Sequence, residues 1–179
     1  MTNISSITFV HILNILEKNT KIEIDEMLTY ASLDKEIVYD EEKFIDSKTL
    51  STIFRYCAQK TNDDTLALKI GTSTSYHSLG VLGYLMHNAR TLKEVIEKFD
   101  YYQNLISSFF NFKLIKEEEF YKLVIYINEI PMIPVPRSHA EVHLSAIVTI
   151  LNQILDKKIY PDKMHFSFKA DFFINKYEE

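Results

Sequence analysis

The sequence predicts an α+β fold, in which a helical N-terminal half is followed by a small antiparallel sheet with a long helix packed against it. Apolar residues first recur at the 3.6-residue spacing of amphipathic helices. From Phe110 onward they alternate at the two-residue spacing of strands. Only 3 glycines and 4 prolines occur among 179 residues, so long regular elements should dominate over loops.

Capping residues mark where helices should begin in the N-terminal half. Ser5 or Ser6 can cap a first helix, and Asp46 or Ser47 can cap another, because short polar side chains accept hydrogen bonds from the first helical amides. Between them lies a charge-rich stretch without a clear period. The expected elements are a helix after Ser5 or Ser6, a short helix over 24–32, a surface connector over 34–46, a helix from Ser47 to near Thr61, and a short helix over 65–70.

All three glycines fall between positions 71 and 83, where each predicts a special backbone position. Gly71 follows a short apolar helix and is expected to close it in a left-handed conformation. Gly80 and Gly83 fall within the apolar string LGVLGYLM, which is predicted to be helical. A residue without a side chain in such a helix lets another backbone approach closely.

The C-terminal half begins with a clear helix signal, since Thr91 and Glu94 form a capping box. Ser138 and Glu141 form a second capping box, before another long apolar helix. The expected elements are a helix over 91–108, a hairpin of strands around the acidic turn 117–119, an extended connection through Pro131, Pro134 and Pro136, a helix ending near Leu155, and a third strand over 164–169.

Composition limits the classes of function. The formal net charge of −5 opposes binding to a phosphate backbone, so autonomous nucleic-acid binding is not expected. Cys57 is the single cysteine, which excludes an intramolecular disulfide. The N-terminus lacks a secretory signal pattern, and charges interrupt every apolar stretch before it could span a membrane. We expect one soluble, cytoplasmic domain over residues 1–179 with no membrane partner.

No pattern in the sequence predicts catalysis. No serine, cysteine or aspartate sits in the context of an activated nucleophile, and no glycine-rich loop precedes a helix. His139 and His143 are one helical turn apart and could face one metal ion, but Glu141 is not placed as a metalloprotease base. Solvated or helix-capping histidines explain this spacing better. We therefore predict no enzyme activity, metal or cofactor.

Tyrosine and phenylalanine side chains recur through the central third of the chain and suggest either core or the wall of a pocket. Tyrosine combines an apolar ring with a hydroxyl that needs a partner, and imidazoles can fix a polar head group. A phenylalanine would bury an apolar part of a ligand. The candidate ligand-binding residues are Tyr84, His87, Tyr101, Tyr102, Phe110 and His139.

Three strings carry a family resemblance: TNDDTLALKIG (61–71), SLGVLGYLMHNARTLKEVIEKFDYY (78–102) and RSHAEVHLSAIVTILNQIL (137–155). The chain resembles the N-terminal sensor domains of AraC-type bacterial transcription regulators, in the longer, non-cupin subgroup that is arabinose-binding-like. The first pattern is matched at Asp64, Leu66, Leu68 and Gly71, and the second at Leu79, Gly80, Leu82, Gly83, Tyr84, Thr91 and Leu92.

The resemblance implies a regulatory domain that binds a small, partly apolar effector, forms a homodimer and controls an attached DNA-binding module. The family's C-terminal pair of helix-turn-helix motifs is missing from this sequence, so DNA is expected as a partner only through that module. Two alternatives stay open. One is a ligand-free dimerisation or protein-interaction domain that uses the helices over 91–106 and 140–155. The other is a metal or haem sensor that uses His139 with His143, or His87.

Overall fold

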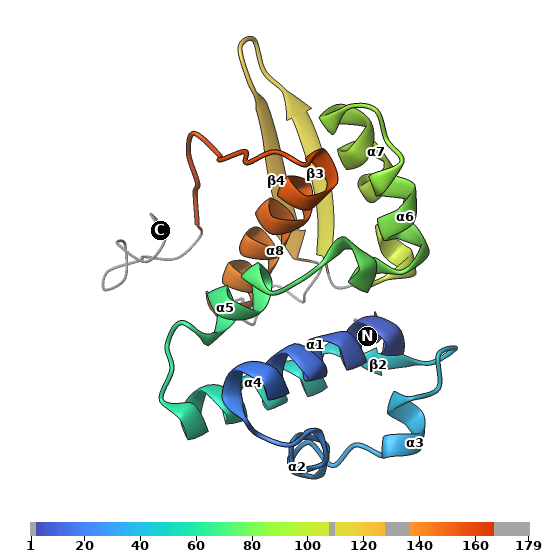
Figure 1. Ribbon diagram of the computed structural model, residues 1–179, viewed down its shortest axis with the longest axis vertical. Coiled ribbons are helices and arrows are strands. Elements are labelled where there is room, and N and C mark those ends of the chain that lie inside the picture. Colours follow the sequence, from blue (N-terminus) through green and yellow to red (C-terminus); the bar gives the residue numbers. More distant parts are fainter. Residues whose placement is uncertain (1–2, 108–109, 128–136, 167–179) are drawn as a thin grey trace.

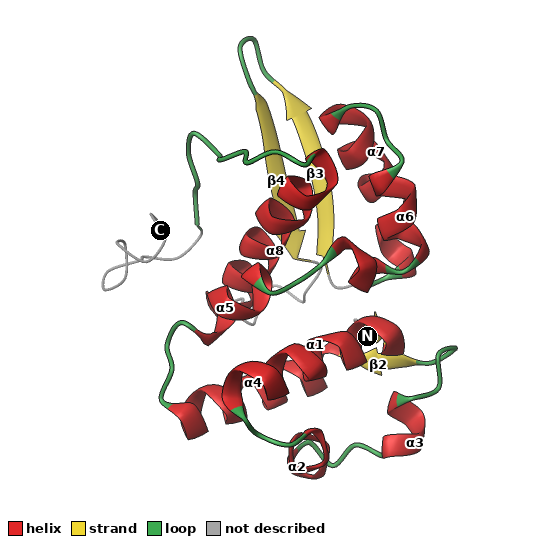
Figure 2. Cartoon of the chain, viewed as in Figure 1, coloured by secondary structure: helices red, strands yellow, loops and turns green. Residues whose placement is uncertain are grey.

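The computed structural model describes residues 3–107, 110–127 and 137–166, and within these ranges the chain is α+β, as predicted (Figures 1 and 2). The N-terminal half contains β1 (Asn3–Ser5), α1 (Ser6–Thr20), α2 (Ile24–Tyr30), α3 (Lys35–Val38), β2 (Phe44–Asp46), α4 (Ser47–Thr61) and α5 (Leu66–Thr72). The C-terminal half contains the 3-10 turn η1 (Tyr76–Leu79), α6 (Val81–His87), α7 (Leu92–Tyr102), the 3-10 turn η2 (Gln103–Leu105), β3 (Phe110–Lys116), β4 (Tyr121–Ile127) and α8 (Arg137–Leu155).

The N-terminal half packs around α1, whose Phe9, Leu13 and Leu16 are fully buried. Ile53 of α4 and Ile70 of α5 pack in the same core. The predicted caps are confirmed for both long helices. The Ser5 hydroxyl accepts a hydrogen bond from the amide of residue 8, and the Asp46 carboxylate accepts one from the amide of residue 48. Capping of this kind fixes where each helix begins.

The C-terminal half packs α6, α7, the β3–β4 hairpin and α8 around a second apolar core (Figure 1). The hairpin is antiparallel, with Phe110 opposite Ile127 and Lys116 opposite Tyr121, as the two-residue period predicts. The chain after α7 also ties back to the N-terminus, because the Ser5 amide donates to the carbonyl of Ile106 at 2.8 Å.

Helix α5 joins the two cores. Its Leu66 and Ile70 belong to the N-terminal core, while Gly71 lies against α8. A Cβ at Gly71 would overlap the hydroxyl of Ser145 and come within 2.6 Å of the carbonyl oxygen of Val142. The two helices can therefore approach this closely only because residue 71 has no side chain.

The predictions for Gly71 and Gly80 are wrong: the close-packing glycine is Gly71, and the glycine with a positive φ is Gly80. Gly71 lies inside α5 and is a close-packing residue, whereas a left-handed cap was expected there. Gly80 lies before α6 with φ 56°, in open space, whereas it was expected inside a helix. The prediction for Gly83 is confirmed, because a Cβ there would overlap the carbonyl of Tyr76.

Other departures from the expected elements are local. The expected connector over 34–46 contains α3 and β2, and β2 pairs with β1 with Ile4 opposite Ile45. Helix α7 gives way at Tyr102 to a 3-10 turn, earlier than expected. Residues 164–166 of the expected third strand have no regular structure, and its residues 167–169 lie outside the described residues. The expected proline-rich connection, with Pro131, Pro134 and Pro136, also lies outside them.

Candidate functional site

A cleft of about 460 Å³ opens where α4, the α4–α5 connection and the first turn of α8 meet. Its apolar surface comes from Phe54, Leu66 and two alanines, and its polar surface from both halves of the chain. The lining residues are Ser51, Phe54, Arg55, Ala58, Asp63, Asp64, Leu66, Ala67, Arg137, Ser138, His139 and Glu141. A volume of this size is within the range of small-molecule sites.

One hydrogen bond ties the two sides of the cleft together. The Ser51 hydroxyl on α4 lies 2.8 Å from Nε2 of His139 on α8, and His139 is only 7% exposed. Burial, followed by the neighbouring His143, lowers the pKa of His139 to about 4. At neutral pH this imidazole is therefore uncharged, and it contributes hydrogen-bonding capacity to the cleft without a charge.

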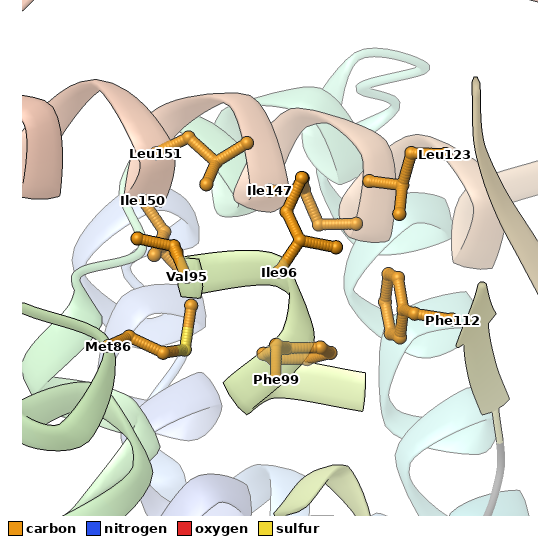
Figure 3. Close-up of a pocket in the computed structure, with 9 residues that line it drawn as sticks. All are labelled: Met86, Val95, Ile96, Phe99, Phe112, Leu123, Ile147, Ile150 and Leu151. Carbon is orange, nitrogen blue, oxygen red and sulfur yellow. The ribbon is translucent and has the colours of Figure 1, made fainter. Parts of the chain in front are cut away.

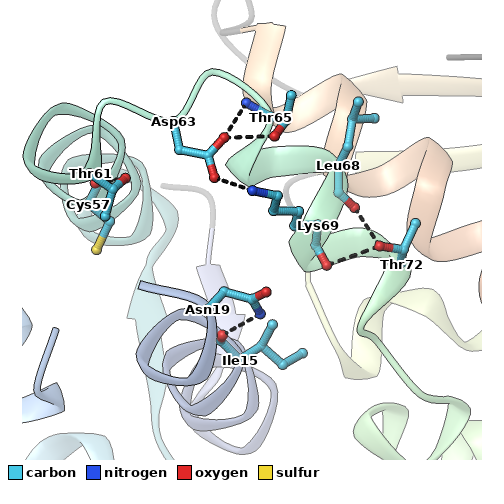
Figure 4. Close-up of polar contacts among 9 residues, drawn as sticks. All are labelled: Ile15, Asn19, Cys57, Thr61, Asp63, Thr65, Leu68, Lys69 and Thr72. Carbon is cyan, nitrogen blue, oxygen red and sulfur yellow. Dashed lines mark hydrogen bonds and ion pairs between the residues drawn. The ribbon is translucent and has the colours of Figure 1, made fainter. Parts of the chain in front are cut away.

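Most of the charged groups in the cleft already have partners. Glu141, only 2% exposed, is paired with Arg137 at 2.5 Å along α8. The predicted capping box of Ser138 and Glu141 is wrong, because α8 already begins at Arg137 and Ser138 therefore lies inside the helix. Glu141 pairs with Arg137 instead. The Asp63 carboxylate accepts two hydrogen bonds from Thr65, and it forms an ion pair with Lys69 at 2.6 Å (Figure 4). Burial alone would raise the pKa of Asp63, but these partners outweigh it and lower the pKa to about 2.

Arg55 and Asp64 differ from those groups. Both side chains line the cleft and are exposed, and within the described residues neither makes a hydrogen bond or an ion pair. The Ser138 hydroxyl at the start of α8 is likewise without a bond within that part of the chain. These three groups can turn to a ligand without breaking an existing contact.

A second cavity, of about 30 Å³, lies in the C-terminal core, and all the described side chains that line it are apolar (Figure 3). Phe112 and Leu123 of the hairpin face Ile147 and Leu151 of α8 across it, and Phe99 of α7 packs edge-on to Phe112. The volume is about that of one water molecule, and apolar cavities of this kind stay dry. It is too small to hold an effector.

The structure does not bring together the five predicted residues whose side chains it describes. Of these five, only His139 lines either cavity. Tyr84 and His87 are exposed on α6, where the His87 ring stacks on Tyr76 at 4.7 Å and Tyr84 meets His77 edge-on. Tyr101 and Tyr102 contact each other on α7 and are 78% and 38% exposed. Phe110 opens β3, and its side chain lies outside the described part.

Apart from His139, sequence reasoning predicted none of the residues that line the cleft as ligand contacts, and Ser51, Arg55, Asp64 and Ser138 are among those it missed. Asp64 appeared there only as a match to a family pattern. Arg55 directly follows the buried Phe54 on an amphipathic helix, which is where any solvated arginine would also lie. No local signal distinguishes an arginine that lines a cleft from an arginine that is merely solvated, since the cleft forms only when α8 packs beside α4.

The histidine pair on α8 is engaged within the protein. Nδ1 of His143 lies 2.6 Å from the carbonyl oxygen of His139, and burial lowers the pKa of His143 to about 4. Across the described ranges, no group of three or more histidine, cysteine, aspartate or glutamate residues is placed to hold a metal ion. Among the helices so described, none has the length and apolarity needed to cross a membrane.

Comparison with known protein families gives one match. The model described as "Arabinose-binding domain of AraC transcription regulator, N-term" matches residues 22–178, which is most of the chain. A search of curated proteins gives no match. The family match extends from the turn after α1 through α8, and so includes every residue that lines the cleft.

Proposed function

Because the chain belongs to the family of N-terminal arabinose-binding domains of AraC transcription regulators, we propose that it senses a small effector in the cleft between α4, α5 and α8. The family is a regulatory class and not a class of enzymes. In this proposal the domain passes the state of the cleft to an attached DNA-binding module, and His139 is the residue among the sequence-predicted candidates that contacts the effector.

The observation that carries the proposal is the composition of the cleft. Its 460 Å³ combines buried apolar side chains with polar groups that converge from α4 and α8. Small-molecule sites typically have such an apolar lining with a few placed polar groups, which fix the ligand's orientation. The cavity under the hairpin is too small for an effector, and its described lining is apolar.

The position of the cleft supplies a mechanism for signalling. One wall belongs to the N-terminal core, while the other is the first turn of α8, a helix whose later residues Ile150 and Leu151 lie in the C-terminal core. An effector that contacts Arg55 on one side and Ser138 on the other would favour the arrangement of the two halves in which both contacts are made. Only such a difference in affinity between two arrangements can shift their populations.

Homodimerisation is the second part of the proposal. Tyr101 and Leu105, at the end of α7 and in the following turn, are 78% and 58% exposed. Tyr84 on the neighbouring α6 is 57% exposed. Large apolar side chains that gather on one part of a surface are typical of protein contacts. Here the aromatic candidates Tyr84, His87, Tyr101 and Tyr102 would serve the dimer and not the effector.

The effector proposal predicts a specific pattern of thermal stabilisation. A panel of sugars, carboxylic acids, amines and amino acids should contain at least one compound that raises the melting midpoint by roughly 5 to 10 °C at a hundredfold excess over its Kd. Ser138→Trp, which places an indole in the cleft, should abolish that shift. Gln59→Trp, on an exposed position of α4 outside the cleft, should keep it.

Two results would overturn the effector proposal: no compound in the panel stabilises the chain, or the shift survives Ser138→Trp. Light scattering on the same samples reports the mass in solution. A mass near 21.0 kDa at micromolar concentration would contradict the dimer, independently of the outcome for the effector.

A further inference from the structure

The charges that line the cleft leave one cation and one anion for a ligand. Among the described residues, five charged ones line it: Arg55, Asp63, Asp64, Arg137 and Glu141. Arg137 and Glu141 pair with each other, and Asp63 is held by Lys69 and Thr65. Arg55 and Asp64 remain, and within the described residues both are without a hydrogen bond or ion pair.

These two groups belong to different elements that line the cleft. Arg55 is on α4, and Asp64 lies in the connection to α5. The apolar part of the lining includes Phe54 and Leu66, which are 6% and 2% exposed. His139 adds no charge at neutral pH, because its pKa is lowered by burial. The free charge of the lining therefore sums to zero, with opposite signs carried by separate residues.

We propose that the effector is a zwitterion of the α-amino-acid class with an apolar side chain, an inference that rests on the proposed effector site. Its carboxylate would accept hydrogen bonds from the Arg55 guanidinium, and its ammonium group would donate to the Asp64 carboxylate. Its side chain would contact Phe54 and Leu66. Arginine recognises a carboxylate through two parallel hydrogen bonds, which gives orientation as well as affinity.

Other ligand classes satisfy the cleft less completely. An anion without an ammonium group leaves Asp64 beside a second negative charge, which is unfavourable. A cation without a carboxylate leaves Arg55 beside a second positive charge, which is equally unfavourable. A neutral sugar can donate and accept hydrogen bonds but balances neither charge. Only a ligand with both charges gives each free group an opposite partner.

The test compares ligands that differ by one charged group. Leucine, methionine and phenylalanine are titrated calorimetrically against the full chain. For leucine, 3-methylbutylamine lacks the carboxylate and 4-methylpentanoate lacks the ammonium group, while L-arabinose represents neutral sugars. At least one amino acid should bind, and removal of either of its charged groups should weaken binding about tenfold or more, as expected for a lost charged hydrogen bond.

Two substitutions assign each charge to its partner. Arg55→Gln should weaken binding of the amino acid about tenfold but should not weaken binding of its decarboxylated amine, because Arg55 repels that cation. Asp64→Asn should weaken binding of the amino acid equally but should not weaken binding of the amino-free acid, which Asp64 repels. Arg90→Gln and Asp162→Asn, at exposed positions outside the cleft, serve as matched controls and should bind like the parent chain.

The outcomes separate this inference from the proposed function. If a sugar or a simple carboxylate binds and Ser138→Trp abolishes that binding, the cleft is the effector site but the zwitterion is wrong. The same conclusion follows if an amino acid binds with equal affinity to Arg55→Gln and the parent chain. If no compound of any class binds, both proposals fail.

Discussion

Gly71→Ala is expected to destabilise the chain by about 3 kcal/mol, near the upper end for an overpacked core. The new Cβ would overlap the Ser145 hydroxyl, which could rotate, but it would also lie within 2.6 Å of the Val142 carbonyl oxygen on the backbone of α8. Backbone cannot move aside without shifting the whole helix. Urea denaturation of the variant and the parent chain measures the difference in the free energy of unfolding.

The control for this prediction is Thr72→Ala, one residue further along α5. Thr72 is exposed, and its hydroxyl bonds only to carbonyls of its own helix. Its replacement should change the free energy of unfolding by about 0.5 kcal/mol or less. Equal stability of Gly71→Ala and Thr72→Ala would mean that α5 and α8 are not in close contact at residue 71.

Acidification from about pH 6.5 to about pH 5 is expected to lower the free energy of unfolding by about 2 kcal/mol for each of His139 and His143. Both have a folded-state pKa of about 4, below the ordinary value of 6.5. The unfolded chain therefore binds more protons in this window. Stability is complete above pH 6.5 and falls until the pH reaches about 4.

Urea denaturation across this pH range measures the effect, with the double variant His139→Gln/His143→Leu for comparison. The variant should show a much flatter dependence, although His11, whose pKa is also lowered by burial, retains part of the slope. Asp63 does not interfere, because its contribution is lost only between pH 3.8 and about 2. Parallel curves for the variant and the parent chain would contradict the lowered pKa values of the two histidines on α8.

Local signals in the sequence predicted most of the elements. Helix caps at Ser5 and Asp46, the change of period at Phe110 and the acidic turn all act between near neighbours in the chain, so they can be interpreted without the fold. Strand β2 could not be predicted in this way, because three residues become a strand only by pairing with β1. The same limit explains the error at Gly71. A helix end and a helix contact both favour glycine, and the contact is made by α8, far along the sequence.

The candidate site was harder to predict than the fold. The sequence singled out His139, since an imidazole can fix a polar head group, but the aromatic candidates on α6 and α7 line neither cavity. Arg55 and Asp64 carry no distinguishing pattern. What sets them apart is that the neighbouring charges are already paired, and pairing depends on three-dimensional contacts.

Hydrogen exchange with and without the stabilising compound tests the central claim most directly, which is that the effector binds between α4, α5 and α8. The account predicts that the compound slows exchange of backbone amides in residues 51–67 and 137–141, the two segments that form the cleft. Exchange in the β3–β4 hairpin and in α7 should change little. Protection confined to the hairpin, α6 and α7, around the apolar cavity, would contradict the account.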